Sequence, residues 1–398
     1  MYKSIMVAID NSEWSEYATD LAIHLARAAG VRLTGCHVYA AALHSQRFRQ
    51  VEPGLPERYQ TTEVLEHQRS IHEDLIGRGL EIITDSYLDA FAVRCRQAGL
   101  EADRRVREGR NYEELIKEVG EGGYDLVVIG AHGLGKVDRS IIGSVCERVA
   151  RMVDCDLLAA RQGRHLGSGP LMVAIDGSPH SFAALRAALF LSRACAIPML
   201  AVAAYDPFFH GVAFRSIVGV LSAERAQLFR FEAQQRLHDE IIDQGLAQVY
   251  GSHLLRAQEM AQRQDRPLEI KVLEGKPFDA IADEAQRVQP SLLLVGRHGA
   301  HRGSGVTLGS TAENLLRFAG CNVLVVSRGA SQPEGDGEEE TDMKPGVRWS
   351  EEARQRLERV PSFARVMARK AIENWARERG HTEITLAVYE EARQHFRR

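Results

Sequence analysis

Cysteine is scarce in this chain, and its positions show no pattern of joint use. The 398 residues contain six cysteines, with no CxxC pair and no Cys/His spacing typical of a metal site. Buried thiols in a reducing cytoplasm explain such usage better than disulfides or zinc ligands do. An excess of one charge is also missing: the formal net charge is −4, so no global basic field indicates a nucleic-acid partner.

Long apolar runs are absent as well. No stretch approaches the roughly 20 apolar residues of a membrane-spanning helix, so we expect no membrane partner. Strand-like sequence begins at about Ser4 and leaves no room for a signal peptide, so we expect a cytoplasmic protein. The hydrophobic fraction, 44%, is sufficient for a core in each of several domains.

One pattern is present twice. The sequence VVIGAHG is followed by a loop and GSVCERV, and LLVGRHG is followed by a loop and GSTAENL. Both copies read Gly-x2-Gly-x9-Gly-Ser, and matching positions are 166 residues apart. The same offset relates two VAID tetrapeptides, which end in Asp10 and Asp176, and it relates Tyr39 to Tyr205. An offset this constant predicts the duplication of a whole domain.

Strands and helices alternate along both copies. Residues 41–60 indicate an irregular excursion, and we expect the helical pattern at 62–99 to break between Gly77 and Ser86. The second copy repeats the plan of the first, with a long helical stretch at 222–264. Alternation of this kind predicts an α/β fold, with two tandem, doubly wound, Rossmann-like domains built on parallel sheets.

Domain boundaries follow from this register and from a change in composition. We expect the first domain at 1–165 and the second at 166–329. Residues 330–345 are rich in Gly, Pro and acidic side chains, which predicts a solvated linker. Residues 346–398 predict a small helical C-terminal domain, whose last helix Thr385 can cap. This domain is basic, with 12 Lys and Arg against 8 Asp and Glu.

The repeated loop has the features of a phosphate-binding site. A strand that leads through a glycine-rich loop to a helix start lets backbone N–H groups approach an anion. Ser144 and Ser310 stand at the helix starts, where each hydroxyl can bond a phosphate oxygen or cap the helix. The loop is not a Walker A motif, because GK[ST] is missing. The first strand–helix turn lacks GxGxxG, which excludes a dinucleotide fingerprint.

Two acidic residues and two histidines accompany the loops. Asp10 and Asp176 end the first strand of each copy, at the sheet edge where ligands bind. Each carboxylate can accept from a ribose hydroxyl, hold Mg2+ or cap the next helix. His132 and His298 lie between the loop glycines, as structural donors or as catalytic groups. No nucleophile–base–orienter set has a recognisable spacing, so we predict no catalytic residue and no dedicated metal site.

The VAID-x-S opening and the Gly-x2-Gly-x9-Gly-[Ser/Thr] loop resemble the ATP-binding branch of the universal stress protein family. The resemblance covers residues 1–329 and implies an adenine nucleotide alpha hydrolase-like fold that binds ATP or AMP. It implies that Asp10 and Asp176 contact adenine or ribose, and that Val38 and Ala204 line the adenine pocket. It implies that ribose and phosphates are held by Gly130, His132, Gly133, Gly143, Ser144, Gly296, His298, Gly299, Gly309 and Ser310. Arg297, which matches Ala131, departs from the first copy and is expected to add a charge to the second loop.

Domains of this family typically pair through their last strands. We therefore expect 156–160 and 322–327 to pair antiparallel within the chain, as a pseudo-dimer, because an open edge strand favours aggregation. A homodimer of the whole chain stays open.

The tail WSEEARQRLERVPSFARVMARKAIENWARERG resembles the small C-terminal domain of the B subunit of light-independent protochlorophyllide reductase. No cluster-ligand cysteines accompany it, so no reductase activity is implied, and we expect a module that binds a protein partner. A nucleic-acid contact is the less favoured alternative, because the excess of basic residues is small.

Together these features favour a cytoplasmic, ATP- or AMP-binding stress or signalling protein. One alternative is a slow ATPase or an autophosphorylating enzyme that uses Ser144 or Ser310. The missing general base and the missing P-loop lysine argue against efficient turnover. The other alternative is an adaptor protein whose loops bind no nucleotide.

Overall fold

The protein is described by a computed structural model that covers most of the chain. It describes residues 2–137, 140–161, 163–206, 243–300 and 307–327, and in the C-terminal region 348–358, 369, 372–373, 375–377, 379, 381 and 383–395. Two compact units are present, residues 1–331 and 332–398. The first unit contains both copies of the repeat.

The two repeats have the same order of strands and helices. The elements of the first are β1 (Ile5–Ile9), α1 (Glu13–Ala29), β2 (Leu33–Tyr39), α2 (Ala41–Val51), α3 (Thr62–Gln97), β3 (Ala102–Glu108), α4 (Asn111–Gly122), β4 (Leu126–Gly130), α5 (Ser144–Met152) and β5 (Asp156–Ala160). Those of the second are β6 (Leu171–Ala174), α6 (Pro179–Cys195), β7 (Met199–Tyr205), α10 (Asp243–Gln262), β8 (Glu269–Glu274), α11 (Pro277–Val288), β9 (Leu292–Gly296), α12 (Ser310–Phe318) and β10 (Val323–Val326).

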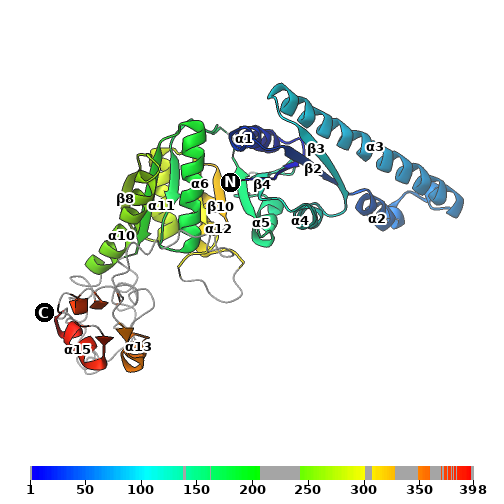
Figure 1. The fold of residues 1–398 in the computed structure, drawn as a ribbon. Coiled ribbons are helices and arrows are strands. Elements are labelled where there is room, and N and C mark those ends of the chain that lie inside the picture. The colour runs from blue at the N-terminus through cyan, green and yellow to red at the C-terminus, as the bar shows by residue number, and fades with distance from the viewer. Residues whose placement is uncertain are drawn as a thin grey trace. The chain divides into compact units, whose positions relative to one another are not determined.

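All ten strands of the first unit form one sheet, in the order β3-β2-β1-β4-β5-β10-β9-β6-β7-β8 (Figure 1). Each repeat contributes five parallel strands. The halves meet where β5 and β10 run antiparallel, with Leu324 opposite Leu158. This contact confirms the predicted pairing of the two last strands, and each protects the other's edge from solvent.

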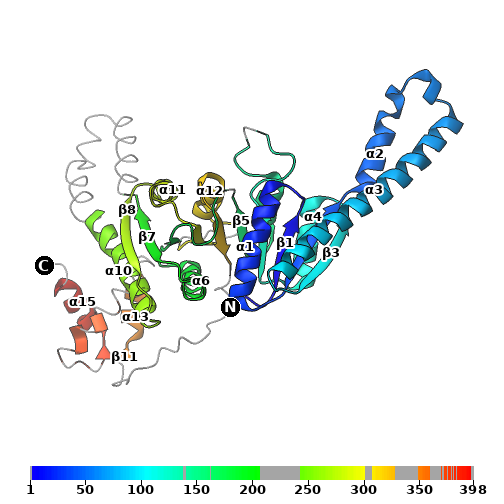
Figure 2. The same ribbon diagram turned by 90° about the horizontal axis from the view of Figure 1, so that it is seen from above.

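Helices cover both faces of the sheet, as a parallel sheet requires (Figure 2). Alternate strand residues point to opposite faces. Ile5 and Val7 of β1 belong to the core that also contains residues of α1, α3, α6 and α10, whereas Met6 and Ala8 belong to the core that contains residues of α4, α5, α11 and α12. Each of the two cores contains residues of both repeats, so the repeats are packed as one body. The predicted α/β fold class is confirmed.

Matching serines begin the first helix of each repeat. Ser12 accepts a hydrogen bond from the Ser15 amide at 3.2 Å, and Ser178 accepts one from the Ser181 amide at 3.1 Å. These bonds satisfy amides that the first turn leaves without intrahelical partners.

The segment after β2 differs from the sequence-based expectation. Residues 41–60 are not irregular: α2 is followed by two short 3-10 helices, Glu52–Gly54 and Glu57–Tyr59. The helix α3 does not break between Gly77 and Ser86 but runs unbroken over 36 residues. Both figures show α2 and α3 as a hairpin that extends beyond the sheet.

Packing at both ends explains why α3 is continuous. Its first half lies against α2, where Arg69 pairs with Glu52 at 2.6 Å and the rings of Phe48 and His72 stack. Its second half buries Phe91 and other residues on the sheet. These contacts outweigh the cost of about 1 kcal/mol that each interior glycine adds to a helix.

In the second repeat, α10 confirms the later part of the helical stretch expected at 222–264. The earlier part of that stretch lies outside the described residues, as does the expected linker at 330–345.

The C-terminal unit has a small core of its own, which includes Trp349, Leu357, Trp375 and Tyr389. Its described elements are β11 (Arg348–Trp349), α13 (Glu351–Glu358), β12 (Glu383–Ile384) and α15 (Leu386–His395). The two helices agree with the predicted ones, and Thr385 Oγ1 accepts from the Val388 amide at 3.5 Å. The parallel pair β11–β12 was not predicted, because two-residue strands have no sequence periodicity.

Candidate functional site

Strands β1 and β4 lie side by side in the centre of the first repeat, with Val7 opposite Val128. From β1 the chain continues through α1 to β2 on one side, and from β4 through α5 to β5 on the other. A reversal of this kind opens a crevice at the carboxyl ends of the two strands. Asp10 follows β1 and Gly130 ends β4, so both lie at this crevice.

A pocket of about 900 Å3 occupies the crevice. It is lined by all seven residues predicted for the first copy, which are Asp10, Val38, Gly130, His132, Gly133, Gly143 and Ser144. These residues come from the ends of three strands, from the loop after β4 and from the start of α5, and the tertiary structure brings them together.

Two loop glycines are required by close packing. A β-carbon at Gly130 would lie 2.7 Å from Cβ of Trp14 and 2.8 Å from the main-chain oxygen of His132. A β-carbon at Gly133 would overlap the carboxylate of Asp10. The loop therefore lies directly on α1 and on the acidic residue that ends β1.

The carboxylate of Asp10 organises the start of α1. Its Oδ1 accepts from the Ser12 amide at 3.0 Å and from the Ser12 hydroxyl at 2.6 Å. Ser12 is the residue that caps the helix, so Asp10 supports the cap and does not replace it.

His132 lies in the loop with only 9% of its surface exposed. Burial lowers the pKa of its imidazole, and the positive charges of Arg161 and Lys136 lower it further. Both effects favour the neutral form of the ring. Among the described residues, no hydrogen-bond partner reaches its Nδ1 atom.

Trp14 links His132 to Lys136. The indole meets the His132 ring edge to face, with centroids 5.5 Å apart, and Lys136 Nζ lies 4.8 Å from the Trp14 centroid. A cation–π contact of this kind holds the ammonium group beside the pocket, which Lys136 also lines.

Ser144 is the first residue of α5, and its side chain is exposed. The N-cap position belongs to Gly143, which has no side chain to cap the helix. Ser310 and Gly309 have the same arrangement at the start of α12. The serine hydroxyls therefore do not act as N-caps.

The outer wall of the pocket comes from the α2–α3 hairpin, which sequence reasoning missed. Leu43, His44 and Arg47 of α2 and Tyr87 of α3 line it. Tyr87 packs edge to face on His37, with centroids 5.2 Å apart. The spacing of 43, 44 and 47 on one helical face was the signal that could have predicted this wall.

The predicted residues of the second repeat have positions and contacts similar to those of the first. Asp176 lies against Gly299, and Gly296 lies against the first turn of α6. The ring of His298 meets that of His180 edge to face, with centroids 5.2 Å apart. Ala204 is buried near the end of β7. The loop between Ala300 and Thr307 lies outside the described residues.

Arg297 donates from Nε to the main-chain oxygen of Thr307 in its own loop, at 3.1 Å, and also reaches the first repeat. Its side chain is 5% exposed and crosses into the first repeat. There Nη2 donates to the main-chain oxygens of Ala150, at 2.7 Å, and Val153. The guanidinium group therefore joins the second loop to the first repeat.

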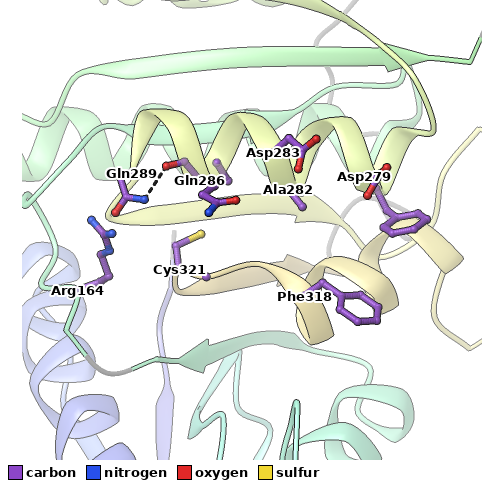
Figure 3. A pocket seen from close by; sticks show the side chains of 11 residues that line it. Arg164, Asp279, Ala282, Asp283, Gln286, Gln289, Phe318 and Cys321 are labelled. Atoms are coloured by element: carbon purple, nitrogen blue, oxygen red, sulfur yellow. Dashed lines mark hydrogen bonds between the residues drawn. The ribbon is translucent and has the colours of Figure 1, made fainter.

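A second pocket, of about 630 Å3, lies between α11 and the end of α12 (Figure 3). Asp279, Asp283 and Arg164 border it, and Phe278 and Phe318 add apolar surface. It contains none of the predicted site residues, so we do not assign it to the repeated loops.

Two further searches cover the described part of the chain. No group of three or more His, Cys, Asp or Glu residues there could hold a metal ion. No helix within it is both long and apolar enough to cross a membrane.

Comparison with known sequences agrees with this geometry. The sequence profile of the Universal stress protein family matches residues 1–161 and again 168–327. The chain belongs to the universal stress protein family. Residues 349–393 match the profile described as the Proto-chlorophyllide reductase 57 kD subunit.

Two curated relatives and one solved structure are similar to this chain. Universal stress protein YxiE of Bacillus subtilis is 25% identical over 161 residues, which is 40% of this chain and 100% of that protein. A putative universal stress protein of Staphylococcus haemolyticus is 28% identical over 161 residues, 40% of this chain and 85% of its own length. A universal stress protein structure from Archaeoglobus fulgidus covers 82% of this chain and 98% of its own, with a TM-score of 0.52 and 16% identity. The structural likeness shows that the two universal stress protein repeats share that fold.

Proposed function

We propose that the first repeat binds an adenine nucleotide, ATP or AMP, and that its occupancy has a regulatory or signalling role in a stress response. The gathering of seven predicted residues in one pocket of about 900 Å3 carries this proposal. The volume is within the range of small-molecule sites. Membership of the universal stress protein family supports it.

The parts of the pocket suit the parts of a nucleotide. Amides at the start of α5 and the ammonium group of Lys136 offer positive charge to phosphates. Val38 and Tyr39, at the end of β2, offer a surface for the adenine ring. Mg2+ would bind through the phosphates with Asp10, because this ion often uses one or two carboxylates together with substrate phosphates.

Equilibrium dialysis of the intact protein against ATP and AMP tests the proposal. We expect saturable binding of at least one of them, with GTP as the control ligand. Gly130→Val should abolish binding in the first repeat, because its side chain would enter the space of Trp14. If neither nucleotide binds, the alternative of an adaptor without nucleotide is favoured.

A slow ATPase or autophosphorylation is the second candidate. One observation favours it: the exposed hydroxyl of Ser144 lines the pocket at the start of α5. Incubation with ATP should then add a phosphate group that mass spectrometry detects and that Ser144→Ala removes. A protein that gains no phosphate and releases none would exclude this activity.

We further propose that the C-terminal unit binds a protein partner and responds to nucleotide occupancy, in a cytoplasmic protein. All six cysteines are free thiols, in keeping with a reducing compartment. Hydrogen exchange of the full chain with and without ATP tests the coupling. We expect altered protection at residues 348–395, and identical exchange there would contradict it.

A further inference from the structure

The acidic residue that ends the first strand has different surroundings in the two repeats. Asp10 borders the large pocket and accepts at Oδ1 from Ser12. Asp176 accepts at both oxygens, with Oδ1 3.0 Å from the Ser178 amide and Oδ2 2.9 Å from the Ala300 amide. The second carboxylate is therefore engaged on both sides by its own repeat.

His253 of α10 covers the backbone beside Asp176. Its imidazole lies so close to Gly177 that a β-carbon there would overlap the ring. Tyr250 supports it, with ring centroids 5.9 Å apart, and itself stacks on Tyr205 at 6.2 Å. Burial raises the pKa of Tyr250, and the negative charge of Asp176 raises it further. Burial lowers the pKa of His253, and the charge of Asp176 opposes that shift, so the carboxylate acts on both rings.

The matching positions of the first repeat form no such cover. Thr84 matches Tyr250, and its hydroxyl donates to the Leu80 oxygen of its own helix at 2.7 Å. Tyr87 matches His253, but its ring packs edge to face against His37 at the pocket wall. The second repeat has Ala203 in place of His37, so His253 has no such partner to hold it away from the strand end.

Gly177 is a further difference between the two repeats. Its φ of 83° and its missing side chain leave room for the imidazole. The matching residue, Asn11, also has a positive φ, 58°, but carries a side chain. The ring could not take the same position above it.

We infer that the two sites are unequal: the first repeat takes the nucleotide, and His253 closes the second, so that one nucleotide binds per chain. This inference rests on the proposed function. It identifies His253 as the residue that decides stoichiometry, although both loops have the complete glycine pattern.

Isothermal titration of the intact protein with ATP tests the inference. We expect one nucleotide per chain for the unchanged protein and two for His253→Ala. Leu255→Ala is the matched control, because this side chain is 55% exposed on the same helix. It should keep a stoichiometry of one. Thermal melts establish that each variant is folded.

Trp14 emission assigns each binding event to a repeat. Trp14 contacts the first loop, whereas Trp349 and Trp375 belong to the C-terminal unit. We expect the first equivalent of ATP to change the emission in a way that Trp14→Phe abolishes, and the second equivalent in His253→Ala to leave this Trp14-dependent emission unchanged. Gly133→Val should reduce the stoichiometry to zero alone and to one in combination with His253→Ala.

Three results would overturn the inference. They are a stoichiometry of two in the unchanged protein, a stoichiometry of one in folded His253→Ala, and a single binding event that leaves Trp14 emission unchanged. Binding by no form of the protein would refute the proposed function and the inference with it, whereas binding of two nucleotides refutes the inference alone.

Discussion

Nη2 of Arg297, in the second repeat, donates to the main-chain oxygen of Ala150, in the first, at 2.7 Å. Arg161 of the first repeat makes the reciprocal contact, donating from Nη2 to the oxygens of Leu316 and Arg317. Ala150 and Leu316 are related by the repeat offset, but the two arginines are not. Two different positions have thus supplied the same interaction, a guanidinium group that donates to main-chain oxygens at the end of the opposing helix.

Removal of Arg297 should destabilise the paired repeats. Arg297→Ala leaves buried oxygens at the end of α5 without their donor, which costs about 2–4 kcal/mol of unfolding free energy. Guanidinium denaturation measures the loss. Arg263→Ala, an exposed arginine on the same repeat, should change stability by less than about 0.5 kcal/mol. An equal effect of both variants would contradict the structural role of Arg297.

Glu284 makes stability depend on pH. Its carboxylate is buried on α11 and accepts from Arg287 and, at 2.8 Å, from Lys271, and these bonds lower its pKa to about 2. A pKa that is lower in the folded state adds stability above the unfolded-state value, near 4.5, and this stability is lost as pH falls toward 2. Glu284→Gln should cost about 2 kcal/mol at pH 7, because solvent screens the exposed Arg287.

Urea unfolding at a series of pH values measures this dependence. Between pH 4.5 and 2, stability should fall less in Glu284→Gln than in the unchanged protein. Glu259→Gln, an exposed residue of α10, should keep the original slope. Parallel curves for all three proteins would show that Glu284 does not contribute.

The continuity of α3 can be tested by its glycines. Gly77 and Gly79 lie inside the helix, and a β-carbon at either meets no atom within 4 Å. Substitution by alanine should therefore stabilise the protein by about 0.5–1 kcal/mol at each position. Gly99→Ala is the contrast, because its φ of 74° strains any side chain. The melting temperature should rise for Gly77→Ala and Gly79→Ala and fall for Gly99→Ala. A fall for all three variants would indicate a break in α3.

Lys136 should favour ATP over AMP. Its ammonium group is held beside the pocket by Trp14 and can reach the phosphates of a longer chain. Lys136→Gln should weaken ATP binding roughly tenfold, about 1.4 kcal/mol, and weaken AMP binding less. Titration calorimetry measures both affinities, with Lys276→Gln, on the exposed start of α11, as the control. Equal losses of affinity for ATP and AMP would argue that Lys136 contacts neither the β- nor the γ-phosphate of ATP.

Much of the fold could be predicted from local pattern. The alternation of strands and helices was predicted correctly, because apolar periodicity and glycine positions act over a few residues. The constant offset predicted two matching halves. It also placed Asp10 and Gly130 at one sheet edge, since parallel strands end together. The expected ATP or AMP ligand, the site roles and the domain boundaries stay predictions.

The sequence alone determined that two phosphate-loop patterns follow two equivalent strands, because spacing along the chain is sufficient to specify them. Only the tertiary structure decided that Arg297 turns into the repeat contact and that His253 covers Gly177. Those outcomes depend on side chains that are distant in sequence and meet only after the sheet has formed. Two identical motifs can therefore have different surroundings, because a motif specifies its own backbone but not the helix that packs over it.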